Sequence, residues 1–261
     1  MTIQEMTINQ EHLHGPFDII GDVHGCFVEL QQLLEELGYV VTETDTEMKV
    51  FNVSCPDMRQ VIFLGDLVDR GPDTPSVLGL AMSMVEQGKA LCVPGNHDVK
   101  LVKKLKGRDV KISHGLAESL EQIAGYSEQF RQCVIEFFDG LPSHYILDDG
   151  KLVVAHAGIK ESLQGKDNHR VTAFTLYGDT SGELDEYGLP IRNDWGAKYQ
   201  GTATVVHGHT PMLEPRRVNR TVCIDTGCVF GGKLTALRYP EDEFVSVIAH
   251  RQYSEYIKPL A

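Results

Sequence analysis

One arrangement recurs in the first hundred residues: an apolar stretch runs into a glycine-flanked polar loop, and a helical pattern follows. The apolar stretches cover residues 17–21, 61–65 and 90–95. Apolar side chains at helical spacing predict a helix over 22–39 and a second, opened by a proline, over 75–89. Strands that alternate with helices predict an α/β fold, in which ligands gather at the carboxyl ends of the strands.

The rest of the chain continues this pattern less regularly. Residues 99–140 have a helical pattern, and residues 160–201, rich in Gly, Asp and Asn, are predicted to be surface loops. Further strands are predicted at 49–53, 144–149, 151–158, 203–210, 221–227, 234–239 and 244–249. Because no linker, repeat or low-complexity tract interrupts these elements, we expect one domain over residues 1–261.

Charge and composition exclude several classes of protein. The net charge of −13 argues against a stable nucleic-acid partner, although bound metal cations would still allow an anionic substrate. The six cysteines form no CxxC pair, and the N-terminus lacks the basic start and apolar run of a signal peptide. No stretch reaches the ~20 apolar residues needed to span a bilayer. We therefore expect a cytoplasmic protein with reduced thiols and no membrane partner.

Five glycine-bounded motifs follow apolar strand candidates, and each carries a residue able to bind a metal. They are GDVHG (21–25), GDLVDRG (65–71), GNHD (95–98), HAG (156–158) and GHTP (208–211). Taken singly, each is also compatible with a turn or a hydrogen-bonded histidine. Together, at successive strand ends, they indicate a site for two divalent cations. Oxygen and imidazole ligands suit such ions; we expect Mn²⁺, with Fe, Co, Ni or Zn as alternatives.

These motifs resemble those of the calcineurin-like metallophosphoesterases, in particular the serine/threonine-phosphatase branch, over roughly residues 17–230. The segments LYGDTSGE, LPIRNDW, GHTPMLEPRRVNRT and IDTGCVFGGKLTALRYPE of the C-terminal half resemble bacterial PrpE-type diadenosine tetraphosphatases. They are also similar to the phosphatase module of bacterial polynucleotide kinase-phosphatases, although the chain has no GxxxxGK[ST] kinase motif. The resemblance implies an α/β fold in which two mixed β-sheets pack face to face and are flanked by helices.

The resemblance also implies a role for each matching position. The metal ligands are Asp22 and His24 for the first ion, Asp66 as the bridge, and Asn96, His156 and His209 for the second. His97 matches the general acid, Asp69 the carboxylate that orients it, and Arg70 the phosphate clamp. Weaker candidates, as supports of the ligands or as substrate contacts, are Asp225, Arg192, Arg216, Lys103 and Lys104.

Two positions depart from patterns common in the wider family. Pro211 stands where many metallophosphoesterases have a further histidine ligand, and Asp98 stands where the phosphatase branch usually has glutamate. Two other features allow two interpretations each. The basic stretch 99–111 is either a solvated helix face or a rim that attracts a polyphosphate. Trp195 is either a packing residue or a ring that stacks on a nucleobase.

Three functions fit these residues. The first is hydrolysis of dinucleoside polyphosphates such as diadenosine tetraphosphate by attack of a metal-bound hydroxide, with a phosphorylated small molecule of nucleotide type as substrate. The second is a phosphomonoesterase that acts on phosphoproteins or nucleotide ends. The third is a metal-dependent regulatory module without turnover, which is disfavoured because a pure binder needs neither His97 nor Arg70.

Overall fold

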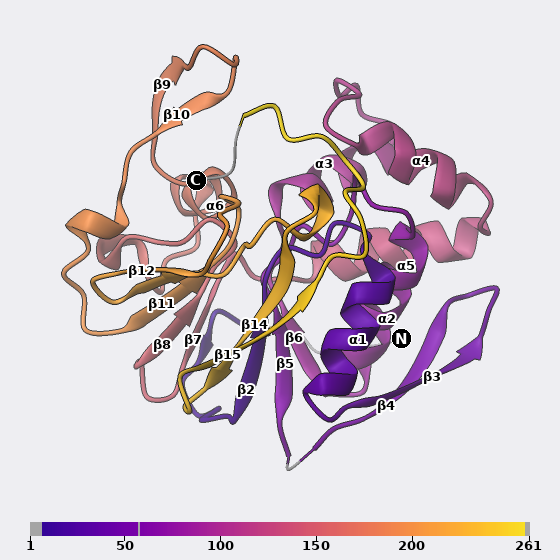
Figure 1. Cartoon of the computed structure of the whole chain (residues 1–261), viewed down its shortest axis with the longest axis horizontal. Helices are drawn as coiled ribbons and strands as arrows, with labels where there is room; N and C mark the ends of the chain where they lie inside the picture. The colour runs from indigo at the N-terminus through magenta and orange to yellow at the C-terminus, as the bar shows by residue number, and fades with distance from the viewer. Residues whose placement is uncertain (1–6, 57, 259–261) are drawn as a thin grey trace.

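A five-stranded mixed sheet carries the first three motifs. The computed structural model describes residues 7–56 and 58–258 (Figure 1). The strand order is β15-β14-β2-β5-β6, with β2 (Phe17–Ile20), β5 (Gln60–Phe63) and β6 (Ala90–Cys92) parallel. The last two strands, β14 (Lys233–Tyr239) and β15 (Glu243–Ile248), add antiparallel to this core. The parallel strands therefore end at one common edge.

A six-stranded mixed sheet carries the remaining motifs, in the order β1-β7-β8-β11-β13-β12. Its strands are β1 (Asn9–Gln10), β7 (Tyr145–Leu147), β8 (Leu152–Val154), β11 (Thr204–His207), β12 (Arg216–Val218) and β13 (Thr221–Cys223). The central strands β8, β11 and β13 run parallel, whereas β7 and β12 pair antiparallel with their neighbours.

The two sheets pack face to face, and helices cover their outer faces. The buried side chains between the sheets come from both, including Ile19 and Ile62 from one and Val154 and Val206 from the other. Five helices cover the five-stranded sheet: α1 (Phe27–Glu36), α2 (Thr74–Glu86), α3 (Asn96–Leu105), α4 (Leu116–Ala124) and α5 (Glu128–Asp139). On the other sheet lie α6 (His169–Tyr177) and the 3₁₀ turns η1 (Glu161–Leu163) and η2 (Gly196–Lys198). The predicted fold class is confirmed.

Two antiparallel hairpins lie outside the sandwich. The first joins β3 (Val40–Asp45) to β4 (Val50–Ser54), so the strand predicted at 49–53 exists but does not enter the main sheets. The second joins β9 (Thr180–Leu184) to β10 (Pro190–Arg192), and it projects from the molecule in Figure 1. The prediction of surface loops over 160–201 was therefore wrong in part, because this stretch contains α6 and the second hairpin.

The helix predicted over 22–39 is shorter than expected, because α1 begins only at Phe27. The preceding DVHG segment is a tight loop in which His24 has a φ of 47°. None of the helices within residues 7–56 and 58–258 combines the length and the apolar character that crossing a membrane requires. The expectation of a single domain over the whole chain stays a prediction.

Candidate metal centre

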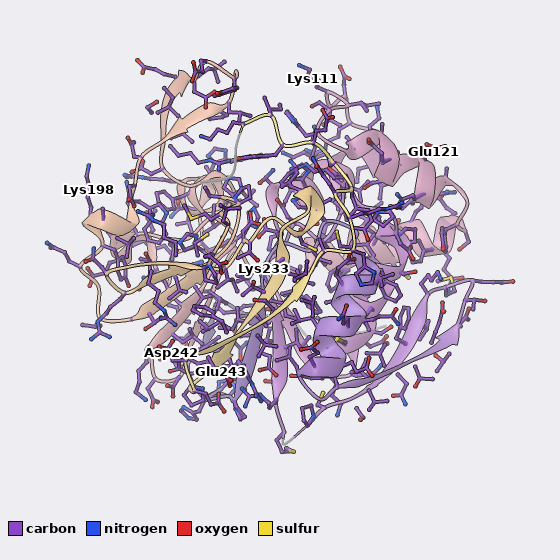
Figure 2. The ribbon with its side chains drawn as sticks, viewed as in Figure 1. Lys111, Glu121, Lys198, Lys233, Asp242 and Glu243 are labelled. Carbon is purple, nitrogen blue, oxygen red and sulfur yellow. The ribbon has the colours of Figure 1, made fainter. Side chains whose placement is uncertain are left out.

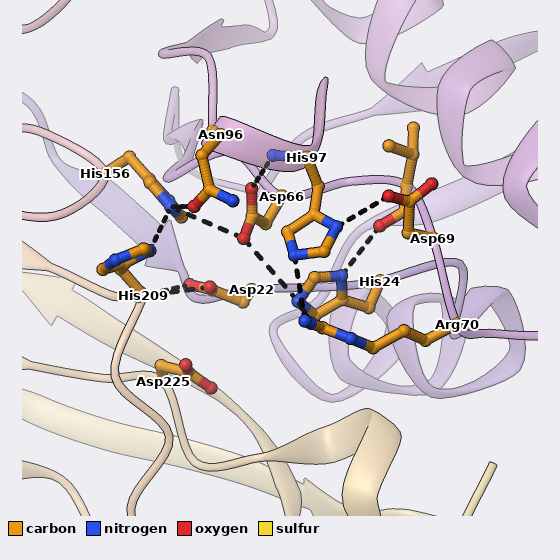
Figure 3. Close-up of polar contacts among 12 residues, drawn as sticks. Asp22, His24, Asp66, Asp69, Arg70, Asn96, His97, His156, His209 and Asp225 are labelled. Carbon is orange, nitrogen blue, oxygen red and sulfur yellow. Dashed lines mark hydrogen bonds and ion pairs between the residues drawn. The ribbon is translucent and has the colours of Figure 1, made fainter. Parts of the chain in front are cut away.

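The five motifs meet at the edge where the central strands of both sheets end. Asp22 follows β2, Asp66 follows β5, Asn96 opens α3 just after β6, His156 follows β8 and His209 follows β11. Figure 3 shows their side chains converging on one small region. Strands far apart in the sequence therefore deliver carboxylate, amide and imidazole groups to the same place, as expected at the carboxyl ends of parallel strands.

The backbone fixes which nitrogen of two histidines faces this cluster. The Nδ1 atom of His24 lies 2.7 Å from the carbonyl oxygen of Val68, and Nδ1 of His156 lies 2.9 Å from that of Leu64. A carbonyl oxygen only accepts, so Nδ1 carries the proton and the Nε2 lone pair faces the cluster. Burial lowers the pKa of His24 well below its usual value and lowers that of His156 to about 3. Both rings are therefore neutral near pH 7, the form that binds metals.

Asp66 lies between the two histidine-bearing halves of the cluster. Its Oδ2 atom is 3.7 Å from His24 Nε2 and 3.5 Å from His156 Nε2, while its Oδ1 accepts the backbone N–H of His97 at 2.9 Å. On the second side, His156 Nε2 lies 3.0 Å from His209 Nδ1 and 3.2 Å from the side-chain oxygen of Asn96. One carboxylate oxygen thus faces donors on both sides, which is the arrangement that a bridging ligand needs.

Three buried carboxyl groups share the centre, and burial is the largest cause of the raised pKa of each. Burial raises the pKa of Asp22 well above its usual value, and the nearby charges of Asp225 and Asp66 raise it further. Burial raises the pKa of Asp66 and of Asp225 to about 7 each. Buried carboxylates are costly unless they are paired or coordinate a metal. The cluster is therefore chemically suited to cations.

The packing around these groups supports the same conclusion. A Cβ atom on Gly208 would collide with Asp22 Oδ1, and one on Gly95 would collide with Asp66 Oδ1. His209 Nε2 is buried without a hydrogen-bond partner in the part of the chain that the structure describes. A pair of divalent cations fits this site, which offers oxygen and imidazole ligands, glycines that leave room for carboxylates, and an unpaired ring nitrogen.

Backbone strain concentrates at the same place. His24, Asp66, Asp69, Arg70 and His209 all have φ between 47° and 75°. Residues other than glycine rarely adopt this region, and such strain gathers at functional sites where the surrounding structure enforces it. Hydrogen bonds between the loops supply that enforcement: the N–H of His24 donates to the carbonyl of Asp66 at 2.8 Å.

A second group of side chains stands beside the metal-binding candidates. His97 Nδ1 lies 2.6 Å from Asp69 Oδ2, and its Nε2 lies 2.9 Å from an Nη atom of Arg70. The other Nη atom of Arg70 lies 2.7 Å from His24 Nε2. Burial raises the pKa of Asp69 to about 6, and the backbone N–H of Asp69 donates to the hydroxyl of Ser119. A histidine oriented by a carboxylate thus faces an arginine at the edge of the cluster.

On the side of His24, the observed contacts differ from the predicted pairing of Asp22 with His24. His24, Asp66 and His97 place donor atoms within 4.8 Å of one another, as do Asp66, His156 and His209. The carboxylate of Asp22 instead accepts the N–H of His209, with both oxygens at 3.1 Å. The Arg70 guanidinium provides the positive charge beside His24. The pairing of Asp22 with His24 on one ion and the noncoordinating role of His97 stay predictions.

The weaker candidates lie in different places. Asp225 follows β13 beside Asp22 (Figure 3). Arg192 and Arg216 both line a cavity of about 190 Å³ that extends from His209, and an Nη atom of Arg192 donates to the Thr210 hydroxyl at 3.0 Å. Trp195 also lines this cavity but is only 7% exposed, with its ring edge-on to Phe174. The packing interpretation of Trp195 therefore accounts for its environment.

The basic stretch lies along and beyond α3, with Lys103 and Lys104 in the last turn of the helix and the metal-binding candidates at its start. Lys106 pairs with the carboxylate of Asp139, and Lys100 donates to the carbonyl and hydroxyl of Ser113. Figure 2 shows Lys111 at the periphery of the molecule. The structure thus does not bring Lys103 or Lys104 into the cluster.

The roles of several residues at the site were not predicted from the sequence. Ser119 accepts from Asp69 although it lies in α4, where no motif marks it. Asp98 accepts the N–H groups of Leu67 and Gly95, so it ties the loop after β5 to the start of α3. Only its place inside the GNHD motif pointed to it. Tyr256, whose ring packs against Phe230, was not named from the sequence.

Comparisons with known proteins agree with this geometry. The sequence profile of the calcineurin-like phosphoesterases matches residues 15–250. The chain is 47% identical over 248 residues to a protein of Anoxybacillus flavithermus named bis(5'-nucleosyl)-tetraphosphatase PrpE (asymmetrical), covering 93% of this chain and 98% of that one. It is 45% identical over 243 residues to the protein of the same name from Bacillus subtilis, with 92% and 97% covered.

Two solved structures share the fold. A crystal structure of a proposed diadenosine tetraphosphatase superposes with a TM-score of 0.65 at 22% identity, covering 94% of this chain and 99% of the other. A serine/threonine phosphatase from Saccharomyces cerevisiae superposes with a TM-score of 0.59 at 13% identity, covering 93% and 83%.

Proposed function

Because this chain belongs to the calcineurin-like phosphoesterase family, we propose that it is a hydrolase that cleaves dinucleoside polyphosphates such as diadenosine tetraphosphate. The observation that carries the proposal is the position of Asp66 between His24 and His156. Arg70, His97 and Asp69 lie beside this set. Together these residues can bind cations and a phosphate, and His97 can donate a proton.

Members of this family use a dinuclear divalent metal centre, and the residues here fit one. Asp22, His24, Asp66, Asn96, His156 and His209 would hold the two ions, for which we propose Mn²⁺. When bound, such ions supply a Lewis acid for the phosphoryl oxygens and lower the pKa of a water molecule that serves as nucleophile. Asp225 supports this set by adding negative charge beside Asp22.

Arg70 orients the reacting phosphate. Its guanidinium offers a planar fork of donors that matches phosphoryl oxygens, and its neighbours at the site are ring nitrogens rather than carboxylates. It is therefore free of a competing ion pair among the contacts described, and its charge can be directed to the substrate. As negative charge grows on the phosphoryl group, this contact strengthens.

His97 handles the proton of the leaving group. The attacking water molecule loses a proton to solvent and its oxygen forms a bond to phosphorus, the bond from phosphorus to the leaving oxygen breaks, and His97 donates a proton to that leaving oxygen. Burial and the charge of Arg70 hold the pKa of His97 low in the free protein. An anionic substrate at Arg70 offsets that charge, and the carboxylate of Asp69 at 2.6 Å favours the protonated ring.

The identity of the substrate rests on the relatives. Proteins that share 44–47% identity over almost the whole chain are named for hydrolysis of bis(5'-nucleosyl)-tetraphosphates with asymmetrical cleavage. We assign the same substrate class and cleavage mode here, and the cytoplasm, where free nucleotides occur, as the compartment. Arg192 and Arg216 line the adjoining cavity, and Arg216 is paired there with Asp194. Arg192, without such an ion pair among the contacts described, is the better suited to contact the phosphates beyond the reacting one.

Product analysis tests this proposal. Chelator-treated protein reconstituted with Mn²⁺ is incubated with diadenosine tetraphosphate, and the nucleotides are separated by chromatography. We expect ATP and AMP in equal amounts and no reaction without added metal. ADP as the only product would contradict the asymmetrical assignment, and no nucleotide product with any divalent cation would contradict the function.

A further inference from the structure

The C-terminal segment after β15 returns across the molecule toward the β9–β10 hairpin (Figure 1). The N–H groups of Tyr253 and Ser254 both donate to the carbonyl of Val229 at 3.0 Å. The buried carboxylate of Glu29 accepts the Tyr253 hydroxyl at 2.7 Å and the N–H of His250 at 2.9 Å. These contacts fix the segment against η3 (Cys228–Phe230), the turn that follows Asp225.

This anchoring places Tyr256 beside Phe230, whose ring lies against Arg70. The two ring centroids are 4.7 Å apart with the planes tilted by 45°. The guanidinium carbon of Arg70 lies 5.2 Å from the centre of the Phe230 ring. Burial raises the pKa of the Tyr256 hydroxyl, and the charges of Arg192, Asp225 and Arg70 act on it. The aromatic pair is thus adjacent to the residue that we assign to the phosphate.

We propose that Phe230 and Tyr256 form a stacking surface for one nucleobase of the substrate. The inference rests on the proposed function, because it names how the same site would recognise a nucleotide. Aromatic rings beside a basic group suit a nucleotide, since the base stacks while the cation contacts the phosphate. A phosphate bound at Arg70 would place its nucleoside close to Phe230, because the Arg70 guanidinium lies against the Phe230 ring.

Trp195, the aromatic candidate named from the sequence, does not offer such a surface. Trp195 is enclosed, with the rings of Phe174, Tyr199 and His207 around it. Tyr256 is only partly buried, and Phe230 is its ring neighbour. A partly exposed ring held by a fixed segment can stack on a base without repacking the interior.

Kinetics of Tyr256→Ala and Tyr256→Phe test the inference on two substrates. Diadenosine tetraphosphate carries bases, whereas inorganic tetraphosphate carries none. Stacking on one ring corresponds to roughly a 5- to 100-fold effect, so we expect Tyr256→Ala to raise KM for the dinucleotide about that much. Tyr256→Phe should retain most of the affinity, and neither variant should change KM for tetraphosphate.

Tyr126→Ala is the matched control. Tyr126 pairs with Phe130 at a centroid distance of 4.8 Å and is also partly buried, but it lies between α4 and α5, away from the cluster. Its removal should leave both substrates unaffected. An equal loss on both substrates in Tyr256→Ala would indicate general disruption and would overturn the inference. An increased rate on tetraphosphate would overturn it too, because it would indicate that the C-terminal segment blocks the site.

A binding measurement separates this inference from the proposed function. AMP is added to the protein reconstituted with Zn²⁺, a diamagnetic ion, and saturation transfer to the adenine protons is recorded by NMR. We expect a clear signal that Tyr256→Ala abolishes and Tyr126→Ala retains. An unchanged signal in Tyr256→Ala would overturn the stacking surface even if the dinucleotide is hydrolysed. If it is not hydrolysed, the function fails, but the AMP signal still decides the stacking surface.

Discussion

At the scale of single residues, the account depends most on Asp66. Its Oδ2 atom faces His24 on one side and His156 on the other, so loss of its charge weakens both halves of the centre. We predict that Asp66→Asn lowers the metal content and nearly abolishes turnover, while Asp109→Asn, at an exposed position, changes neither. Metal analysis of the purified variants checks this. Two ions per chain with full activity would show that Asp66 is not the shared ligand.

The prediction for His97 is different, because we propose that it donates a proton to the leaving group and does not bind a metal. General acid catalysis typically contributes ~10²–10⁴-fold, and most where the leaving group needs a proton. We expect His97→Ala to keep both metals and to lose most of its rate on an alkyl phosphate, but much less on p-nitrophenyl phosphate. His12→Ala, at an exposed histidine, is the control. Loss of metal, or equal slowing of both substrates, would instead make His97 a ligand or a structural residue.

At the scale of elements, strand ends and their motifs could be predicted, and the connections could not. The turns around Asp22, Asp66 and His209 combine glycines with polar residues after apolar strands, a local pattern that sequence reveals. Helix α6 and the β9–β10 hairpin were missed because their stretch is polar and rich in turn-forming residues. The hairpin is exposed along its length, so no alternation of apolar and polar residues marks it.

The site shows the same division. Metal-binding candidates sit in short motifs, whereas Ser119, Phe230 and Tyr256 reach the site only through tertiary packing. Asp98 illustrates the boundary between the two. Its motif predicted its location, but its two hydrogen bonds to Leu67 and Gly95 depend on how the loop after β5 meets α3.

The length of α3 bears on the basic stretch. A helix rises about 1.5 Å per residue, so Lys103 lies about 10 Å along the axis from Asn96, near the screening length at 0.1 M salt. We predict that replacing Lys103, Lys104 and Lys106 with glutamine changes KM for diadenosine tetraphosphate by less than about twofold at that salt. Arg192→Gln should raise KM more. A large increase in the lysine variant that salt removes would restore the stretch as an attracting rim.

At the scale of the whole molecule, metal binding should couple to pH. The carboxyls of Asp66 and Asp225 have pKa values of about 7 in the metal-free chain, above their usual values. Their contribution to folding is present at low pH, falls as pH rises from the usual value of 3.8, and is lost once pH passes about 7. Cations must displace their protons at pH 6 but not at pH 8. We therefore predict that Mn²⁺ raises the melting temperature more at pH 8 than at pH 6.

Asp225→Asn removes one of these titrating groups and should reduce the difference between the two pH values. Scanning calorimetry with and without Mn²⁺ makes the comparison. A larger stabilisation by Mn²⁺ at pH 6 than at pH 8 would mean that these carboxyls do not hold protons that compete with the metal.

The central claim is that this centre selects a dinucleoside polyphosphate. The most direct measurement compares kcat/KM for diadenosine tetraphosphate, a phosphoserine peptide and p-nitrophenyl phosphate on one Mn²⁺-loaded preparation. Each substrate is followed by chromatography of its products. We predict that kcat/KM is highest for diadenosine tetraphosphate. Only this substrate can contact the metals, Arg70, Arg192 and the ring pair of Phe230 and Tyr256 together. A higher kcat/KM for the phosphopeptide would contradict the account and make the protein a phosphomonoesterase.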